Sequence, residues 1–196
     1  MKLLDLYETN TDMALHIFKV DNREEFEIFL REITRLLHNY LAAAKTLIDH
    51  TRKLCQDEYK GTEFEAEYNE KINELFVNSP ISKFIQDLRN YSLHRNLPIT
   101  GATLSFNRDS GMSHSINLTK KSLMDWDNWT RKSLDYLSKQ DDQIGLPQMI
   151  KEYTSLVMEF QEWFQEKQYE YHSDSIAELE DLQEEYRELY EEVRRK

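Results

Sequence analysis

The sequence is poor in the residues that cross-link a chain or interrupt its helices. Its 196 residues include one cysteine, three prolines and four glycines. The single cysteine, Cys55, excludes an internal disulfide, and the scarcity of proline and glycine predicts few turns and long helices. No apolar run reaches the length of about 18 residues that a membrane span requires. The N-terminal MKLLDLYETN turns acidic too early for a signal peptide. We therefore expect a reduced, cytoplasmic protein that does not enter a membrane.

The signatures of several large enzyme classes are also missing. The chain has no glycine-rich phosphate loop, no Gly-x-Ser-x-Gly and no cysteine pair that could bind zinc. None of the six histidines follows a glutamate by three residues, and His-Glu-x-x-His does not occur. The sequence therefore predicts no metal site and no bound cofactor. His114 stands between two serines, but no acid partner can be identified for it, so we do not expect a nucleophilic triad there.

Charge is unevenly distributed along the chain. The net charge of −12 argues against a protein that coats DNA or nucleic acid in general. Residues 81–139, however, contain nine Lys and Arg against five Asp and Glu, a net charge of +4, and the remainder contains 16 against 32, a net charge of −16. This basic segment has two interpretations. It is either chance variation in surface charge or a local affinity for an anion such as a phosphate backbone.

Apolar residues recur at helical spacing over most of the chain, which predicts a mainly α fold. The first long helix is expected over 22–58, with Asp21 and Glu24 forming a capping box at its start. Ser79 and Pro80 have the residue types of an N-cap and of a first helical position, which predicts a helix over SPISKFIQDLRNYSLH. Further helices are expected over 60–79, through 123–137, and from Pro147 onward. ALHIFKV, within residues 1–20, fits either a short strand or the approach to a helix.

After Pro98 the period changes from that of a helix to that of a strand. ATLSF and MSHSINL alternate apolar and polar residues on either side of NRDSG. This pattern predicts a β-hairpin near 102–118 with a five-residue loop that ends in Gly111.

The tail from Ser173 differs from the rest of the chain and divides it into a helical domain, 1–172, and an acidic C-terminal helix, 173–196. Its apolar residues are three, four, three and four apart and are surrounded by Glu and Arg. They are Leu179, Leu182, Tyr186, Leu189 and Val193. The spacing favours a helix packed on its own bundle, and the alternative is a coiled coil with a partner.

The helix expected from Pro80 carries an arginine, an asparagine and a histidine shortly before it ends. At about 100° per residue, Asn90 lies about 180° and His94 about 220° from Ile81, whereas Arg89 lies about 80° from it. The arc that we expect to face the core contains Ile81, Phe84, Ile85, Leu88 and Ser92. Asn90 and His94 therefore share a face that points away from the core, and Arg89 flanks the core stripe. That face is either simply solvated, with a histidine favoured by the helix dipole, or a functional site.

The segment from Arg89 to His94, Arg-Asn-Tyr-Ser-Leu-His, resembles the Arg-Asn-x-x-x-His form of the motif of the HEPN superfamily. With the hairpin and the Trp-containing helix that follow, FIQDLRNYSLHRNLPI looks like one bacterial branch of that superfamily, over roughly residues 22–170. The resemblance implies an antiparallel α-helical bundle with one β-hairpin insertion and, beyond the similar region, a long C-terminal helix. It also implies a homodimer whose two motifs form one composite cleft. Active members of the superfamily are metal-independent endoribonucleases, often toxins or antiviral effectors.

The resemblance assigns catalysis to Arg89, Asn90 and His94, with RNA as the substrate. The ribose 2′-OH supplies the nucleophile, a histidine that titrates near neutrality can transfer protons, and an arginine can bind the phosphate and stabilise the transition state. Asn90 would orient His94 or the phosphate, and Tyr91 is expected to pack. Some HEPN toxins are regulated through a tyrosine two residues after the histidine, where this chain has Asn96, although another regulatory protein partner remains compatible with the resemblance.

Two alternatives stay open at the level of sequence. The first is a non-catalytic HEPN module that dimerises or binds RNA or protein, which the acidity and the extended C-terminal helix support. The second is an unrelated helical scaffold in which the motif occurs by chance. The tryptophans Trp126, Trp129 and Trp163 could stack on bases, but their helical spacing favours core packing, and Cys55 is expected to be a buried thiol.

Overall fold

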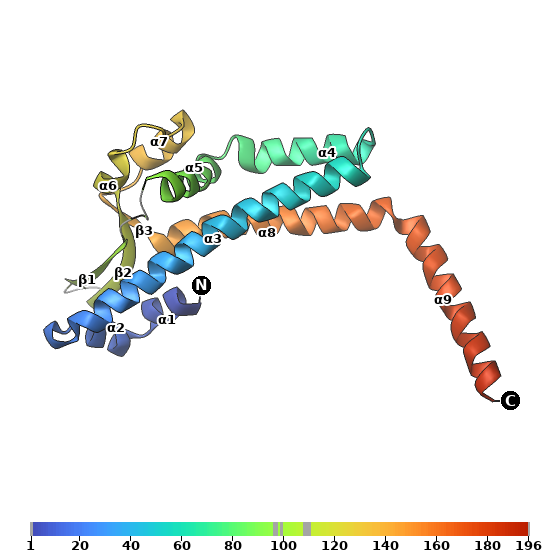
Figure 1. Cartoon of the computed structure of the whole chain (residues 1–196), viewed down its shortest axis with the longest axis horizontal. Helices are drawn as coiled ribbons and strands as arrows, with labels where there is room; N and C mark the ends of the chain where they lie inside the picture. Colours follow the sequence, from blue (N-terminus) through green and yellow to red (C-terminus); the bar gives the residue numbers. More distant parts are fainter. Residues whose placement is uncertain (1, 96–97, 99, 108–110, 196) are drawn as a thin grey trace.

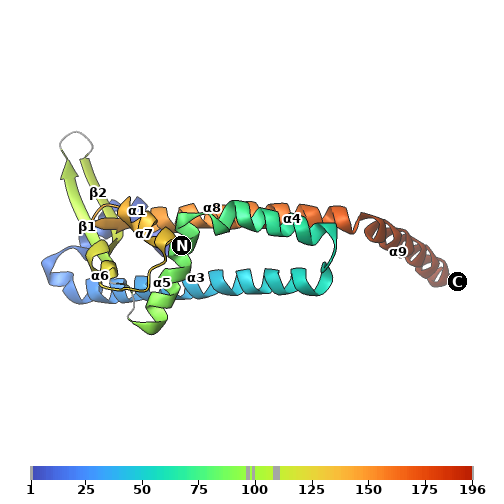
Figure 2. The same ribbon diagram turned by 90° about the horizontal axis from the view of Figure 1, so that it is seen from above.

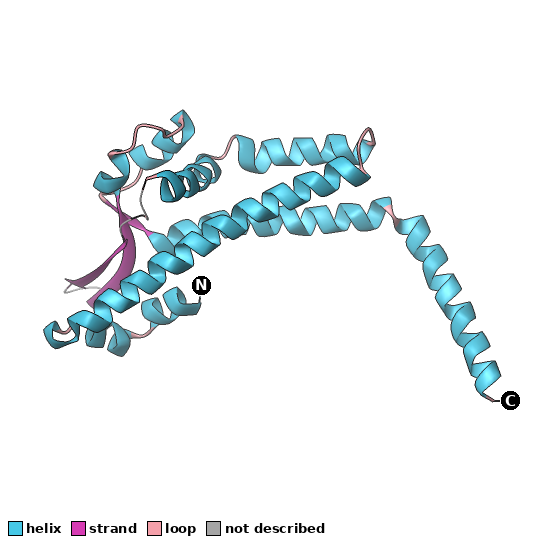
Figure 3. Ribbon diagram, in the orientation of Figure 1, coloured by secondary structure: helices cyan, strands magenta, loops and turns pink. Residues whose placement is uncertain are grey.

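The computed structural model describes residues 2–95, 98, 100–107 and 111–195 (Figure 1). The fold is mainly helical, with a small three-stranded antiparallel sheet at one end of the long helices (Figure 3). The described helices are α1 (Lys2–Thr9), α2 (Thr11–Ile17), α3 (Arg23–Glu58), α4 (Glu63–Ile72), α5 (Pro80–His94), α6 (Lys120–Met124), α7 (Arg131–Ser138), α8 (Leu146–Tyr171) and α9 (Ser173–Arg194). The strands are β1 (Thr100–Asn107), β2 (Gly111–Thr119) and β3 (Gln143–Gly145), and single turns of 3₁₀-helix and π-helix cover Val20–Asn22 and Asn73–Val77.

The start of α3 differs from the capping box expected at Asp21 and Glu24. The helix begins at Arg23, and Asn22 before it makes no side-chain cap hydrogen bond. The amide of Asn22 instead donates to the carbonyl oxygen of His16, 2.8 Å away. That contact ties α3 to α2, which together with α1 forms the N-terminal segment. ALHIFKV lies in α2 and the turn after it, so this segment is the approach to a helix and not a strand.

α3 and α8 lie side by side and run in the same direction (Figures 1 and 2). The hydroxyl of Tyr40 lies 2.9 Å from the hydroxyl of Thr154. Nineteen positions further along α3, the hydroxyl of Tyr59 lies 3.0 Å from Nε2 of His172. Both contacts advance along the two helices together, so this pair is parallel, and the expectation of a wholly antiparallel bundle is wrong here. The chain can pair these helices in parallel because α4 and the elements after it carry the chain back along α3 before α8 starts (Figure 1).

α4 is antiparallel to the two long helices beside it, α3 and α8. It folds back from the end of α3, and ion pairs join it to α8. Lys71 lies 3.2 Å from Glu159, and Glu67, one turn earlier, lies 3.3 Å from Lys167 further along α8. These contacts advance in opposite directions, so α4 and α8 are antiparallel, as the bundle expectation had it.

The predicted β-hairpin is present and gains a third strand. β1 pairs antiparallel with β2, with Asn107 opposite Gly111, and the loop between them lies outside the described residues. β3 pairs with the other edge of β2, so that Ile144 lies opposite Leu118. Both of these side chains are buried against the helices. This third strand was not predicted, because three residues are too few to show a strand period.

The helix expected through 123–137 is in fact two short helices, α6 and α7. Trp126 and Trp129 are both buried between them, with their rings edge to face at 4.8 Å. The indole N–H of Trp129 donates to the carbonyl oxygen of Leu123 at 2.8 Å, and Thr130 then caps α7 by accepting from the N–H of Ser133. The two indoles occupy a bend in the chain rather than one face of a continuous helix.

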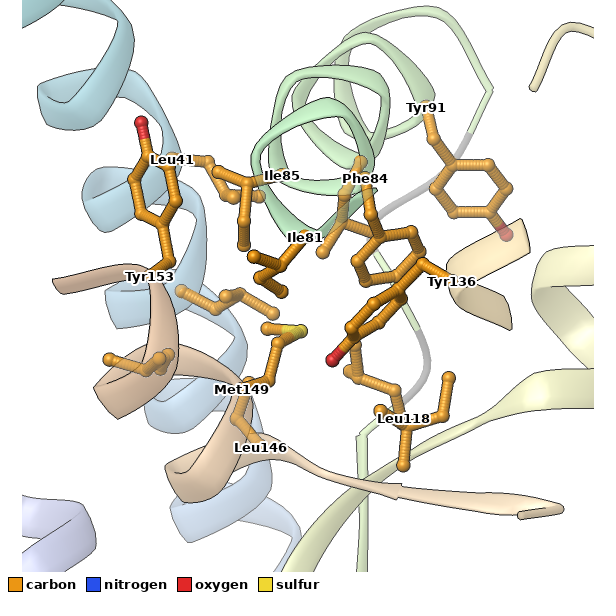
Figure 4. Packing of buried hydrophobic residues seen from close by; sticks show 14 of the residues in the cluster. Leu41, Ile81, Phe84, Ile85, Tyr91, Leu118, Tyr136, Leu146, Met149 and Tyr153 are labelled. Atoms are coloured by element: carbon orange, nitrogen blue, oxygen red, sulfur yellow. The ribbon is translucent and has the colours of Figure 1, made fainter. Parts of the chain in front are cut away.

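α5 runs across the long helices rather than along them (Figure 2). In the core, Ile81 and Ile85 point toward α3 and α8, where Leu41 and Tyr153 lie (Figure 4). On its other flank, α5 stacks Phe84 on the ring of Tyr136, with centroids 4.8 Å apart. α5 is thereby packed on two sides.

α9 leaves the body of the protein after a bend at His172 (Figure 1). The structure describes all of its residues, and none of them is buried. The five apolar residues of its heptad pattern are between 54% and 73% exposed. The favoured interpretation, in which this helix packs on its own bundle, is therefore wrong.

Candidate functional site

The helix that carries the Arg-Asn-x-x-x-His segment is fixed at its start as the sequence predicts. Ser79 is the N-cap of α5, and its hydroxyl accepts from the N–H of Ser82 at 3.4 Å. Pro80 occupies the first turn, where its missing N–H costs nothing. The last helical residue is His94, and the N–H of Arg95 closes the final turn on the carbonyl of Tyr91.

A buried carboxylate holds α5 against α7. Asp87 accepts three hydrogen bonds: from the N–H of Thr130 at 2.9 Å, from the hydroxyl of Thr130 at 2.8 Å and from the hydroxyl of Ser133 at 2.6 Å. Because Thr130 is the N-cap of α7 and Ser133 lies in its first turn, the negative charge also interacts with the positive end of that helix dipole. α5 cannot rotate about its axis without losing these bonds, so the face that it turns outward is set.

That outward face contains the three residues of the motif. Asn90 and His94 are exposed and Arg89 is half-buried, in agreement with the helical-wheel prediction. Arg89 and His94 lie about 140° apart around the helix, at the two edges of the outer face. Asn90 and Leu93 lie between them, and Leu93 is 49% exposed. One copy of the helix therefore presents the arginine and the histidine in different directions.

The inward neighbours of the motif differ in one detail from the prediction. Ser92, assigned to the core arc, is only half-buried, and its hydroxyl donates to the carbonyl oxygen of Arg89 at 2.7 Å. Tyr91 takes the core position, with its ring stacked on Trp129 at 5.9 Å and edge to face with Trp126 at 5.6 Å. Tyr91 is thus a packing residue, as expected.

Three charged residues on α3 form an ion-pair cluster near the arginine edge of this face. Asp49 lies 2.6 Å from Nζ of Lys45 and 3.1 Å from the guanidinium of Arg52. The hydrogen bond from Lys45 lowers the pKa of Asp49, and the positive charges of Lys45, Arg52 and Arg89 lower it further. Arg89 therefore acts on Asp49 through its charge, whereas the direct ion-pair partners of this carboxylate are Lys45 and Arg52. The surplus of positive charge makes the α3–α5 edge attractive to an anion.

The other candidates of the sequence analysis are structural. Trp126 and Trp129 are buried and Trp163 is half-buried, which supports core packing over base stacking. Cys55 is 1% exposed, as expected. Nε2 of His114 lies 2.6 Å from the carbonyl oxygen of Tyr7, to which it donates, so this nitrogen is already engaged.

Among the described residues, no three His, Cys, Asp or Glu side chains gather as the ligands of a metal ion would. Within the same part of the chain, no helix combines the length and the apolar character needed to cross a bilayer. Asn96, where the resemblance places a regulatory tyrosine in other proteins, lies outside the described residues. No family model, curated protein or solved structure matches the chain.

Two features of this site were not predicted from the sequence. Asp87 was not singled out because its partners are 43 and 46 positions away. The grouping of Lys45 and Arg52 around Asp49 follows helical spacing and could have been seen in the sequence, but its closeness to Arg89 depends on how α5 crosses α3.

Proposed function

We propose that the protein is a metal-independent endoribonuclease of the HEPN type that works as a homodimer, with Arg89, Asn90 and His94 as its catalytic residues. The observation that supports this most is the exposure of Asn90 and His94 on a helix that is otherwise anchored in the core. Neither side chain packs in the core of its own chain. A surface that holds an amide, an imidazole and a nearby guanidinium has the groups that RNA cleavage requires.

The reaction would be an internal transesterification of RNA. The ribose 2′-oxygen attacks the adjacent phosphorus while the bond to the leaving 5′-oxygen breaks, which gives a 2′,3′-cyclic phosphate and a free 5′-hydroxyl. His94 removes the proton of the 2′-OH and delivers a proton to the leaving 5′-oxygen. Arg89 stabilises the negative charge of the phosphorane, and Asn90 orients the phosphate or the imidazole.

A second copy of the chain would bring together an arginine and a histidine that a single α5 helix holds apart. Because Arg89 and His94 are about 140° apart around α5, one chain cannot direct both at the same phosphate. A twofold contact across the outer face would bring Arg89 of one copy toward His94 of the other. Leu93 lies between them and, at 49% exposure, offers an apolar contact for that interface.

The proposal is tested with a fluorescent RNA incubated in EDTA. His94→Ala should lower the rate by roughly 10²–10⁴-fold, the usual worth of positioned acid–base catalysis. Arg89→Lys should also impair cleavage, because lysine keeps the charge but loses the paired N–H groups. His50→Ala is the matched control, since His50 is an exposed histidine elsewhere on a helix. Circular dichroism verifies that each variant is folded.

Two outcomes of this assay would contradict the proposal in different ways. If the wild-type protein cleaves none of a varied set of RNAs, catalysis is rejected. If it cleaves and His94→Ala cleaves equally well, the activity stands but its assignment to the motif is wrong. Comparing bacterial growth on expression of wild type and His94→Ala then tests a role as a toxin or antiviral effector.

The second candidate is a non-catalytic HEPN module that dimerises or binds RNA or a regulatory protein. The net charge of −12 and the exposed acidic helix α9 favour it. It predicts binding without product formation, so an RNA that shifts in gel mobility but stays intact would support this reading over the first.

A further inference from the structure

α9 exposes a continuous apolar seam. Leu179, Leu182, Tyr186, Leu189 and Val193 follow the three-four spacing of a coiled coil. Each is more than half exposed, and Val193 reaches 73%. No described residue of the chain covers this seam, since α9 contains no buried position. A helix with such a stripe is normally stabilised by a partner against which the stripe packs.

The residues beside the seam are acidic on one side. If Leu179 is placed at heptad position a, the g positions are Glu178, Glu185 and Glu192, and the e positions are Ile176, Gln183 and Tyr190. Within Ser173–Arg194 there are nine Asp and Glu against two Arg, a net charge of −7. The residues at the e and g positions decide which helices pair. The glutamates at g therefore favour a partner helix that carries positive charge beside its own apolar seam.

We propose that α9 docks a basic amphipathic helix of another protein, with apolar residues at the seam and Lys or Arg opposite the glutamate row. A second copy of α9 fits this surface less well. In an antiparallel pair the glutamate rows would face each other, and in a parallel pair they would meet Gln183 and Tyr190, which offer no positive charge. Over about three heptads, a pair without favourable flanking charges is marginal.

The position of α9 makes this docking independent of the motif. Figures 1 and 2 show α9 projecting from one end of the long helices, whereas α5 crosses α3 nearer its middle. A helix bound to α9 would leave the outer face of α5 free. The docking proposal therefore does not rest on ribonuclease activity and can be tested without RNA.

The test uses the full chain and two synthetic three-heptad peptides, both with Val at a and Leu at d. One peptide has Lys at e and g, and the other has Glu there. Fluorescence anisotropy should show at least about tenfold tighter binding of the Lys peptide, with the difference shrinking at high salt as charges are screened. Leu182→Asp combined with Leu189→Asp should abolish binding, while thermal unfolding of the body stays unchanged because both side chains are exposed.

A charge reversal distinguishes specific docking at the seam from general electrostatic attraction to an acidic helix. Glu178→Lys with Glu185→Lys should shift the preference toward the Glu peptide. Glu184→Lys with Glu188→Lys makes the same change in net charge on the side away from the seam and should keep the original preference.

Three results would overturn the proposal. Equal effects of the two charge-reversal pairs would mean unspecific attraction, and absence of peptide binding would mean that the seam docks no such helix. A dimer in sedimentation that Leu182→Asp with Leu189→Asp converts to monomers would assign the seam to a second copy of the chain.

Discussion

At the scale of the single residue, Asp87 connects the core to the motif. It is 7% exposed and lies two and three positions before Arg89 and Asn90 on the same helix. Its three hydrogen bonds satisfy a charge that would otherwise be costly to bury. Asp87 lies only about 60° from Asn90 around α5, so its bonds to α7 fix the rotation of the helix that leaves Asn90 exposed.

Asp87→Asn should lower the free energy of unfolding by about 1–3 kcal/mol. All three hydrogen bonds end on one oxygen, Oδ2, which the amide oxygen can replace, but the negative charge that strengthens these bonds and interacts with the dipole of α7 is lost. Urea unfolding measures the change. Asp135→Asn, an exposed position on α7, is the control and should stay within about 0.5 kcal/mol of wild type. An equally small effect at Asp87 would show that its hydrogen bonds do not stabilise the α5–α7 contact.

Buried tyrosines make the protein sensitive to alkali. Burial raises the pKa of Tyr153 to about 12, and the nearby Tyr40 contributes to the shift. In the unfolded chain a tyrosine has a pKa of about 10. Between these values the unfolded state loses the proton and the folded state keeps it, so the free energy of unfolding should fall as pH rises from about 10 to about 12.

Tyr153→Phe isolates that contribution. The Tyr153 hydroxyl is buried and has no hydrogen-bond partner within the described part of the chain, so phenylalanine should be tolerated at pH 7. Above about pH 10 the variant should lose stability less steeply than wild type, by up to one proton per molecule. Urea titrations at several pH values provide the slopes. Identical slopes would mean that Tyr153 does not titrate on unfolding.

At the scale of the element, the helices and strands with a long repeating pattern of apolar residues were predicted correctly from the sequence. α3, α5, α8 and the hairpin were found in the sequence because each repeats its own period over many residues. β3 was missed because its three residues acquire their strand character from pairing with β2. The division between α6 and α7 was missed because Trp126 and Trp129 turn inward at a bend that only the packed core defines. Exposure of α9 was also mispredicted, since an apolar stripe does not say which surface covers it.

The short strand β3 should nonetheless be important for stability. Ile144 is 1% exposed and lies opposite Leu118, so Ile144→Ala should cost about 2–5 kcal/mol through lost burial and the cavity that remains. Gln143→Ala, at the exposed neighbouring position of the same strand, serves as the control. A loss below about 1 kcal/mol for Ile144→Ala, measured by thermal or urea unfolding, would show that the third strand is dispensable.

At the scale of the whole molecule, only part of the candidate site could be predicted from the sequence. The helical wheel predicted that Asn90 and His94 point outward, because the direction of a side chain around a helix follows from its position in the sequence alone. The cationic cluster beside Arg89 needs α3 and α5 to cross, and that crossing is set by contacts such as Leu41 with the α5 core face. The composite cleft requires a second molecule and stays a prediction.

Dimerisation through the outer face of α5 is testable with Leu93→Glu. We expect the wild type to sediment as a dimer at micromolar concentrations and the variant as a monomer, because a charge would replace the apolar contact at the centre of the interface. RNA cleavage should be lost with the dimer. Leu134→Glu, at a leucine on α7 that is 40% exposed, is the control and should stay dimeric. A monomeric wild type would contradict a composite site.

The parallel pairing of α3 with α8 also has a consequence for how the chain folds as it is made. The contacts from Tyr40 to Thr154 and from Tyr59 to His172 join residues 114 and 113 positions apart, whereas the α3–α4 turn and the hairpin close over short distances. The early elements can form during translation. The surface of α3 that packs against α8 stays uncovered until α8 has left the ribosome, when nearly the whole chain has been made. High contact order of this kind slows folding. The nascent chain therefore carries an open apolar surface for most of its synthesis, and this is the stage at which it most needs a chaperone.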